Sequence, residues 1–268
     1  YYIVNKKFFS IITMPNLTQA MGIYIKFPNG LRVHKQISWE KKIITYFLKE
    51  LPRFDKFSQN FHYSFQNWLP FYWAGYSQTT KYTYVIENLS SLDEVFDNFD
   101  KKYRNKIKNA KKIVSLKENI SIAEFYKVNM MTFQRQGVKY PYTLEFLKKH
   151  DKVLAEKKSR KIFYTVDEDE QVHSVLYLTW DSNSSYVHMA GEDPSFRNSG
   201  AGLFLVWTAI QYTKEVLKLD KFDFEGSMIE GLEHVRRSFG AIQKPYFKIY
   251  KTNSKLLKIR ELVKEILK

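Results

Sequence analysis

The sequence lacks cysteine and long hydrophobic runs, and each absence excludes a class of protein. Without cysteine there can be no disulfide scaffold, catalytic thiol or thiolate metal ligand. The six histidines show neither H-x-x-x-H nor H-E-x-x-H spacing, so we expect no metal site. The strongest apolar stretch, residues 203–207, is far shorter than the roughly 18 to 20 residues that cross a bilayer, so we expect no transmembrane segment. These features favour a cytoplasmic protein.

Acidic residues are also in short supply, since 28 Asp and Glu face 43 Lys and Arg and leave a net charge of +15. An anionic partner such as tRNA, a nucleotide-linked precursor or a phosphate-bearing cofactor would suit this charge. An AT-rich coding sequence would produce the same Lys-rich composition without selection for binding, so both explanations stay open. The sequence begins at Tyr1, and we expect further residues upstream, with a removed targeting segment as one possibility.

What is abundant is aromatic and apolar: 44% of residues are hydrophobic, with 21 Phe and 19 Tyr, which predicts a globular protein of one large or two modest domains. In the first half, Ser38 resembles an N-cap and a basic amphipathic helix over residues 91–111 would join two halves. The other first-half elements expected are strands over 8–14, 21–27, 54–65 and 81–86 and a helix over 39–51.

The second half has the pattern of a new folding unit, which places the expected domains at residues 1–111 and 112–268. Its order of elements carries more information than any one of them. Periodicity and turn residues predict strands at 113–116, 160–166, 172–180, 185–190, 221–224 and 241–250, and helices at 122–134, 143–157, 202–217, 229–239 and the C-terminus.

One glycine-containing turn stands between a predicted strand and a predicted helix: Arg197-Asn198-Ser199-Gly200-Ala201-Gly202. Glycines at such a junction let backbone N–H groups approach an anion, and the helix N-terminus adds partial positive charge. A Gly-x-Gly pair alone is often only a tight turn. Here six of the ten glycines gather within fifty residues, which favours a backbone built around a ligand.

This turn resembles motif A of the GCN5-related N-acetyltransferases (GNAT), whose Arg/Gln-x-x-Gly-x-Gly/Ala pattern is met by Arg197, Gly200 and Gly202. The stretch from Phe222 to Ser227 resembles the fifth strand of the family and its exit, and residues 235–240 resemble a helix end that carries a Tyr in the family. The resemblance covers residues 113–250. It implies that the turn, including Asn198, Ser199 and Ala201, binds the pyrophosphate of acetyl-CoA or another acyl-CoA.

Residues 83–86, 91–94 and the basic run 103–112 resemble the join in Fem-type peptidoglycan ligases and related two-module acyltransferases. That resemblance implies an α+β fold of two tandem GNAT-like modules, each a mixed, mostly antiparallel sheet flanked by helices, with the N-terminal module degenerate and truncated. Arg104 and Lys108 could then contact tRNA or a phosphate-bearing acceptor, or lie on a solvated helix face. Trp73 could shape the acceptor pocket or belong to an aromatic core.

The reaction that the resemblance implies needs an oxyanion site, a base and an acid. Backbone N–H groups near Met189 and Ala190 would meet the thioester oxygen, exposed by a strand bulge near Met189 and Gly191. Glu225 is the first candidate base and Glu192 the second, unless either is an ordinary loop or cap carboxylate.

The sequence assigns no proton donor for the departing thiolate, and a water molecule or a tyrosine outside the motif could supply the proton. Arg236 stands where the family has Tyr and is a poor proton donor, although it could bind a phosphate or thiolate. Tyr246, with Tyr250, is the remaining candidate in the next strand. His188 and His234 lie in the same region, although a lone histidine is more often a packed core residue than a catalyst.

Three functions remain possible at this level. The leading one is a CoA-dependent N-acyltransferase acting on a small-molecule or peptide amine. The second is an aminoacyl-tRNA-dependent ligase of Fem type that acts on a peptidoglycan precursor. The third is a non-catalytic descendant that binds an anionic polymer or a protein partner through the basic helix, which the missing Tyr favours. The sequence indicates no oligomeric state.

Overall fold

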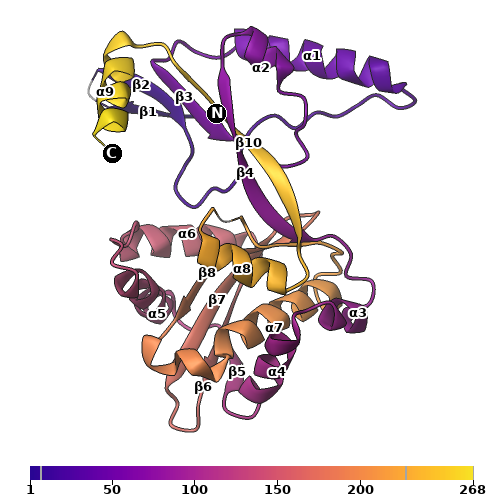
Figure 1. Ribbon diagram of the computed structural model, residues 1–268, viewed down its shortest axis with the longest axis vertical. Coiled ribbons are helices and arrows are strands. Elements are labelled where there is room, and N and C mark those ends of the chain that lie inside the picture. The colour runs from indigo at the N-terminus through magenta and orange to yellow at the C-terminus, as the bar shows by residue number, and fades with distance from the viewer. Residues whose placement is uncertain (7, 227, 268) are drawn as a thin grey trace. The chain divides into compact units, whose positions relative to one another are not determined.

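The computed structural model describes residues 1–6, 8–226 and 228–267, so Ser227 of the predicted strand exit lies outside the described residues. Contacts divide the chain into two units, one made of Tyr1–Thr83 and Lys244–Lys268 and the other of Tyr84–Gln243. Each unit is a mixed sheet flanked by helices, so the fold is α+β, as the sequence predicted (Figure 1). The division differs from the expected boundary at 111/112, because the basic helix belongs to the second unit and the C-terminal helix to the first.

Unit 1 holds five neighbouring strands in the order β1-β2-β3-β10-β4, antiparallel except for the parallel pair β2 and β3 among the pairings with a described register. A cluster of buried aromatic and aliphatic side chains that includes Phe57, Phe61 and Phe71 forms its core. Its elements are β1 (Tyr2–Lys6), β2 (Phe9–Thr13), α1 (Val33–Lys49), β3 (Lys56–Asn60), α2 (Leu69–Trp73), most of β4 (Ser77–Ile86), most of β10 (Ile242–Thr252) and α9 (Lys255–Ile266).

Two predictions for unit 1 were wrong. The segment 21–27 is no strand: Met21 makes an isolated bridge with Phe61, while Ile23 and Ile25 pack against the aromatic cluster, so their alternation reflects burial without a ladder. Ser38 is no N-cap, because α1 begins five residues earlier. Its hydroxyl instead donates to the carbonyl of His34 at 2.9 Å, the back-bond of a mid-helix serine.

Unit 2 contains a sheet in the order β4-β9-β8-β7-β6-β5, in which β8 and β9 are parallel and the other pairs are antiparallel. The predicted strands 160–166 and 172–180 are confirmed to the residue by β6 and β7. Its other elements are α3 (Leu92–Asp97), α4 (Lys101–Ala110), β5 (Ser115–Glu118), α5 (Ile122–Arg135), α6 (Leu144–Glu156), β6 (Arg160–Val166), β7 (Val172–Trp180), β8 (Ser185–Glu192), the 3₁₀ helix η1 (Pro194–Ser199), α7 (Ala201–Glu215), β9 (Phe222–Asp223) and α8 (Glu230–Ser238).

Helices α5 and α7 cover opposite faces of this sheet. Phe163 of β6 packs edge-on against Tyr212 of α7, with ring centroids 5.3 Å apart. Its strand partner is Leu176, so the next residue, Tyr177, points to the other face, where its ring meets Phe125 of α5 at 5.6 Å. Burial on both faces explains why β6 and β7 do not alternate strictly between apolar and polar residues and instead contain the apolar runs 162–164 and 175–178.

The prediction of a single basic helix over residues 91–111 was wrong, because the chain forms two helices there. Ser91 caps α3 by accepting from the Glu94 N–H at 3.3 Å. A second cap follows at Asp100, whose Oδ1 accepts from the Lys102 N–H at 2.7 Å and starts α4. Between them Phe99 is buried and packs edge-on against Trp207 and Phe239. Burial of this ring and a new cap together outweigh continuation of the helix.

Candidate active site

The predicted glycine turn is a 3₁₀ helix that passes through one left-handed residue into α7. Gly200 is that residue, with φ of 75°, and it is the N-cap of α7. A Cβ at Gly200 would lie 3.0 Å from the carbonyl oxygen of Lys106 on α4, so the chain approaches α4 too closely for a side chain. Glycine is therefore required here by both conformation and space.

The first turn of α7 presents backbone N–H groups of the kind that bind anions. The Ala201 N–H donates to Ser199 Oγ at 3.2 Å, and the Phe204 N–H to the Gly200 carbonyl at 3.1 Å. Helix geometry leaves the N–H groups of Gly202 and Leu203 without an intrahelical partner. The turn is thus no part of a strand, and its amides suit a phosphate or carboxylate.

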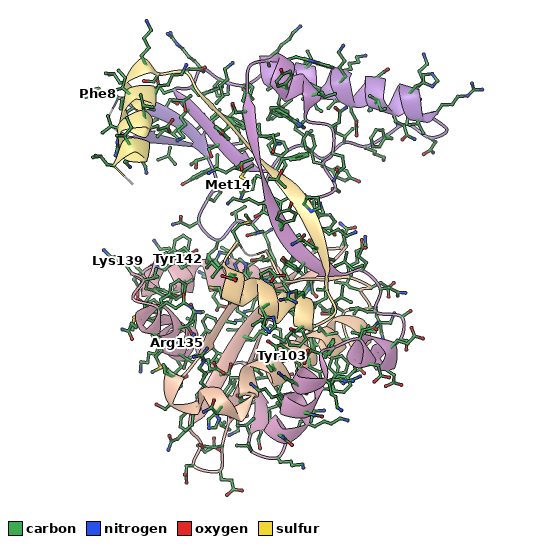
Figure 2. All side chains as sticks on the ribbon, in the orientation of Figure 1. Phe8, Met14, Tyr103, Arg135, Lys139 and Tyr142 are labelled. Atoms are coloured by element: carbon green, nitrogen blue, oxygen red, sulfur yellow. The ribbon has the colours of Figure 1, made fainter. Side chains whose placement is uncertain are left out.

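A carboxylate of the protein already lies at this turn. Glu192 Oε1 is 3.5 Å from the position that a Cβ on Gly202 would occupy. Burial raises the pKa of Glu192, and the positive charges of Arg135, Arg197 and Lys106 partly oppose that rise. Arg135 ends α5 (Figure 2), Arg197 lies in η1 and Lys106 on α4, so three elements bring cations toward one carboxylate.

Strand β8 carries a bulge and then parts from β9. Tyr177 of β7 pairs with Met189 while the next residue, Leu178, pairs with Val187, which leaves His188 as the extra residue. The bulge predicted near Met189 is confirmed. On its other side β8 is paired with β9 only as far as Tyr186, although β8 runs on to Glu192.

Beyond the bulge, β8 approaches α5 closely. A Cβ on Gly191 would be 2.5 Å from Cα of Asn129, so glycine is needed for this contact. The Ala190 carbonyl accepts from Asn129 Nδ2 at 2.5 Å, and Asn129 Oδ1 accepts from the hydroxyl of Tyr140 at 2.6 Å. Ala190, predicted to meet a cofactor, therefore has its carbonyl engaged within the protein.

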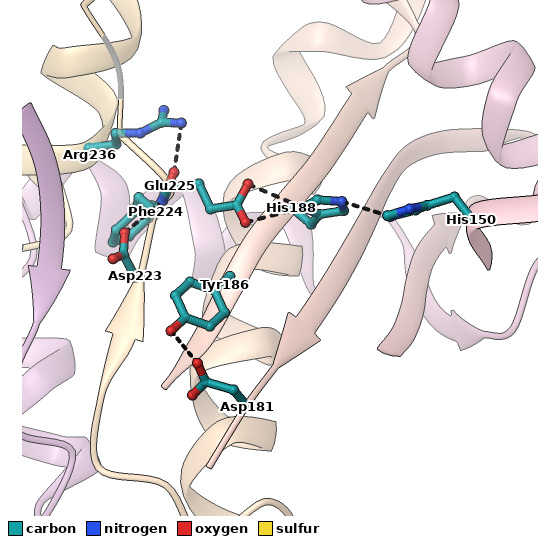
Figure 3. Close-up of polar contacts among 8 residues, drawn as sticks. All are labelled: His150, Asp181, Tyr186, His188, Asp223, Phe224, Glu225 and Arg236. Carbon is teal, nitrogen blue, oxygen red and sulfur yellow. Dashed lines mark hydrogen bonds and ion pairs between the residues drawn. The ribbon is translucent and has the colours of Figure 1, made fainter. Parts of the chain in front are cut away.

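The bulge residue His188 forms a side-chain chain with two other elements (Figure 3). Its Nδ1 lies 3.1 and 3.2 Å from the two carboxylate oxygens of Glu225, which follows β9. Its Nε2 lies 3.0 Å from Nε2 of His150 on α6. The side chains of His188 and Glu225 are 6% and 17% exposed, so the pair is shielded while Glu225 keeps some access to solvent.

Glu225 is held by its own loop. Its φ of 56° is left-handed, a conformation that costs a non-glycine residue of the order of 1–3 kcal/mol, and Gly226 follows at 74°. The Glu225 N–H donates to Asp223 Oδ1 at 2.8 Å, which fixes the turn after β9. The strain thus lies at the residue predicted to be the base.

Arg236 of α8 supports the same loop from the other side (Figure 3). Its Nη2 donates to the Phe224 carbonyl at 2.9 Å. Burial lowers the pKa of Arg236, and the charges of Asp223 and Glu225 partly oppose this.

The remaining predicted residues fall into two groups. Arg104 Nη1 donates to the Asp97 carbonyl at 2.7 Å, and Lys108 Nζ lies 6.0 Å from the ring centre of Phe96, so both make contacts within the α3–α4 segment. Trp73, 58% exposed, and Tyr246, whose hydroxyl accepts from Gln19 at 3.2 Å, belong to unit 1. The roles expected for all four stay predictions.

Sequence reasoning left His188 as either a catalytic or a packed core residue and did not select His150. Neither residue lies in a motif, because α6 and β8 are separated by two strands along the chain and their meeting depends on packing. One usable signal was a histidine beside the expected bulge. His234, the other histidine that the sequence analysis considered, is an exposed residue of α8.

Among residues 1–6, 8–226 and 228–267, no helix is both long and apolar enough to cross a bilayer. The same residues contain no group of three or more His, Asp or Glu side chains placed to hold a metal ion.

Comparison with known proteins identifies the second unit. Residues 97–234, more than half of the chain, match the family described as "Acetyltransferase (GNAT) domain". No curated protein sequence matches. Among solved structures, the crystal structure of FemX is similar with a TM-score of 0.67, 11% sequence identity, and coverage of 91% of this chain and 82% of that one. The structure of L-PGS from Bacillus licheniformis has a TM-score of 0.53 and 12% identity over 87% of this chain and 78% of that one. At these identities the similarity is one of fold.

Proposed function

The chain belongs to the GNAT acetyltransferase domain family, and from that premise we propose that it moves an acyl group from an acyl-CoA thioester to an amine, with Glu225 as the base. The observation that carries the proposal is the Glu225–His188 pair at the point where bulged β8 parts from β9. In the reaction a C–N bond forms, the C–S bond breaks, and the amine proton passes to the base. CoA leaves as its thiolate.

Glu225 suits the base because its carboxylate is accessible and oriented. His188 Nδ1 contacts both oxygens, which restricts rotation of the carboxylate, and the loop from Asp223 fixes the backbone. A positioned base of this kind contributes about 10²- to 10⁴-fold to a proton-transfer step. Arg236 takes the place of the family's Tyr and acts here through its hydrogen bond to the Phe224 carbonyl, since a guanidinium does not give up its proton.

Backbone donors of β8 suit the oxyanion. A bulge removes one residue from the ladder, so an N–H near His188 is free of strand pairing with β7. A preformed backbone donor costs no reorganisation when negative charge develops on the acyl oxygen. Met189 and the bulge are the positions at which this donor is proposed.

The turn from Arg197 to Gly202 suits the pyrophosphate of the donor. It offers amides at the start of α7, and Arg135, Arg197 and Lys106 add positive charge. Glu192 already shares these cations, so an incoming phosphate must displace this carboxylate or meet it protonated. Its raised pKa favours the second route. Glu192 is thus better suited to the donor site than to the role of second base.

The test combines binding with turnover. Acetyl-CoA and longer acyl-CoAs should raise the Tm of the protein saturably, and a panel of amines should reveal turnover by released CoA thiol. Glu225→Gln should lower kcat about 10²-fold or more while leaving the acyl-CoA shift intact. The matched control is Glu168→Gln, an exposed carboxylate in the β6–β7 turn, which should change neither. Full turnover in Glu225→Gln would remove Glu225 as the base.

A second donor, aminoacyl-tRNA, is favoured by the extent of one structural likeness. FemX is similar over 91% of this chain, which includes both units, and the net charge of +15 suits a polyanion. A Tm shift with aminoacyl-tRNA but none with any acyl-CoA would replace the leading proposal with this one. Binding of neither donor would favour the non-catalytic alternative.

A further inference from the structure

Glu225, His188 and His150 form a continuous hydrogen-bonded row drawn from three elements (Figure 3). The imidazole rings of His150 and His188 are nearly parallel, with centroids 5.2 Å apart and planes 22° apart. The ring of Phe146 is also nearly parallel to that of His150, with centroids 6.2 Å apart. The ring of His150 is therefore held in one orientation, with Nε2 aimed at Nε2 of His188.

The hydrogens in this row follow from donor and acceptor rules. An ionised carboxylate only accepts, so His188 must carry its hydrogen on Nδ1 to bond Glu225. In neutral His188 the Nε2 then carries no hydrogen and can only accept a hydrogen bond. The 3.0 Å contact with His150 is consequently a hydrogen bond in which the Nε2–H of His150 is the donor.

We propose that His150 is a positioning residue for the acyl transfer, an assignment that rests on the proposed function: it fixes His188 in the Nδ1–H tautomer and thereby holds the carboxylate of Glu225 in place. His150 touches neither acyl donor nor acceptor in this scheme and acts through His188. Loss of the bond would free the His188 ring to turn or to move its hydrogen to Nε2. Either change removes the donor to Glu225.

The surroundings keep the His150 ring neutral. This is the form that the proposed hydrogen bond from its Nε2–H to Nε2 of His188 uses. Burial is the main cause that lowers the pKa of His150 to about 4, and the charge of Asp151 opposes this only in part. Asp151 is itself engaged by Arg160 at 2.9 Å and by the Tyr177 hydroxyl at 2.8 Å. On the Glu225 side, Tyr142 and Arg236 are the facing titratable and charged groups.

The experiment compares two substitutions in the full chain. His150→Phe keeps a ring between Phe146 and His188 but has no donor, whereas His150→Gln carries an amide N–H with a reach similar to Nε2. Hydrogen–nitrogen NMR correlations of the His188 ring at neutral pH report which nitrogen carries the hydrogen. Wild type and His150→Gln should show the Nδ1–H form, and His150→Phe should lose it.

Activity gives the second readout. His150→Phe should lower kcat about tenfold, the effect of one lost hydrogen bond, with KM for the acyl donor unchanged, and His150→Gln should restore most of it. An Nε2–H form of His188 in the wild type would overturn the proposal without any variant. So would an unchanged tautomer in His150→Phe. Because NMR needs no turnover, failure of the proposed acyl transfer and failure of the tautomer assignment are separate results.

Discussion

Gly200 and Glu225, two residues of the site, have left-handed backbones, and only one of them is glycine. At Gly200 the conformation turns the chain into α7 against the Lys106 carbonyl. At Glu225 it brings a carboxylate to His188, and the N–H bond to Asp223 helps to maintain it. A glycine at position 225 would remove the backbone strain but would also remove the carboxylate, so the site retains the strained glutamate.

Gly200→Ala should destabilise the protein by about 1–3 kcal/mol, because a Cβ would both strain φ and press on the Lys106 carbonyl. The matched control is Gly231→Ala in α8, where nothing lies within 4 Å of the added Cβ and φ is not positive. There alanine should be neutral or stabilising by up to about 1 kcal/mol. Urea unfolding of both variants measures the difference, and equal effects would contradict it.

His150 should make stability depend on pH in a defined direction. Its pKa is about 4 in the folded protein and 6.5 ordinarily, so between these values the unfolded chain binds a proton that the folded chain does not. Its contribution is present above about 6.5 and is lost as the pH falls toward 4. Urea unfolding should therefore show a larger loss between neutral and acid pH for wild type than for His150→Phe. An equal loss in both would show that His150 does not titrate in this way.

At the scale of elements, two local features shape the site: the break between α3 and α4, and the parting of β8 from β9. The break lets α4 start at Asp100 and present the Lys106 carbonyl to Gly200. The parting leaves the bulged part of β8 without β9 as a strand partner. In both places a regular element ends early, and side-chain contacts replace its backbone hydrogen bonds.

Asp100→Ala should cost about 1 kcal/mol, since it removes the cap that the Lys102 N–H uses. Asp169→Ala, at an exposed turn position, is the comparison substitution and should change stability little. Asp100→Asn should retain most of the stability, because its amide oxygen also accepts at an N-cap. Thermal unfolding of the three variants checks the order, and a neutral Asp100→Ala would mean that packing of Phe99 alone sets the break.

At the scale of the whole molecule, the excess of 43 basic over 28 acidic residues bears on how donors bind. Affinity for acetyl-CoA should fall several-fold as NaCl rises from about 0.05 to about 0.5 M, because salt screens its phosphates from the cations. Acetyl-pantetheine, which lacks the pyrophosphate and the nucleotide, should show no such dependence. Calorimetric titrations at both salt concentrations make the comparison, and equal slopes for the two ligands would argue against the basic turn as the donor site.

The sequence by itself determined the features that depend on near neighbours in the chain. The periodicity of residues 160–166 and 172–180 predicted β6 and β7 without error, and the spacing of Arg197, Gly200 and Gly202 identified the turn before α7. Tertiary structure alone decided the end of α3, because burial of Phe99 involves Trp207 and Phe239. It also decided that His150 and His188 meet, because the contact between a residue of α6 and a residue of β8 depends on how the helix packs on the sheet. No local pattern in the sequence encodes that packing.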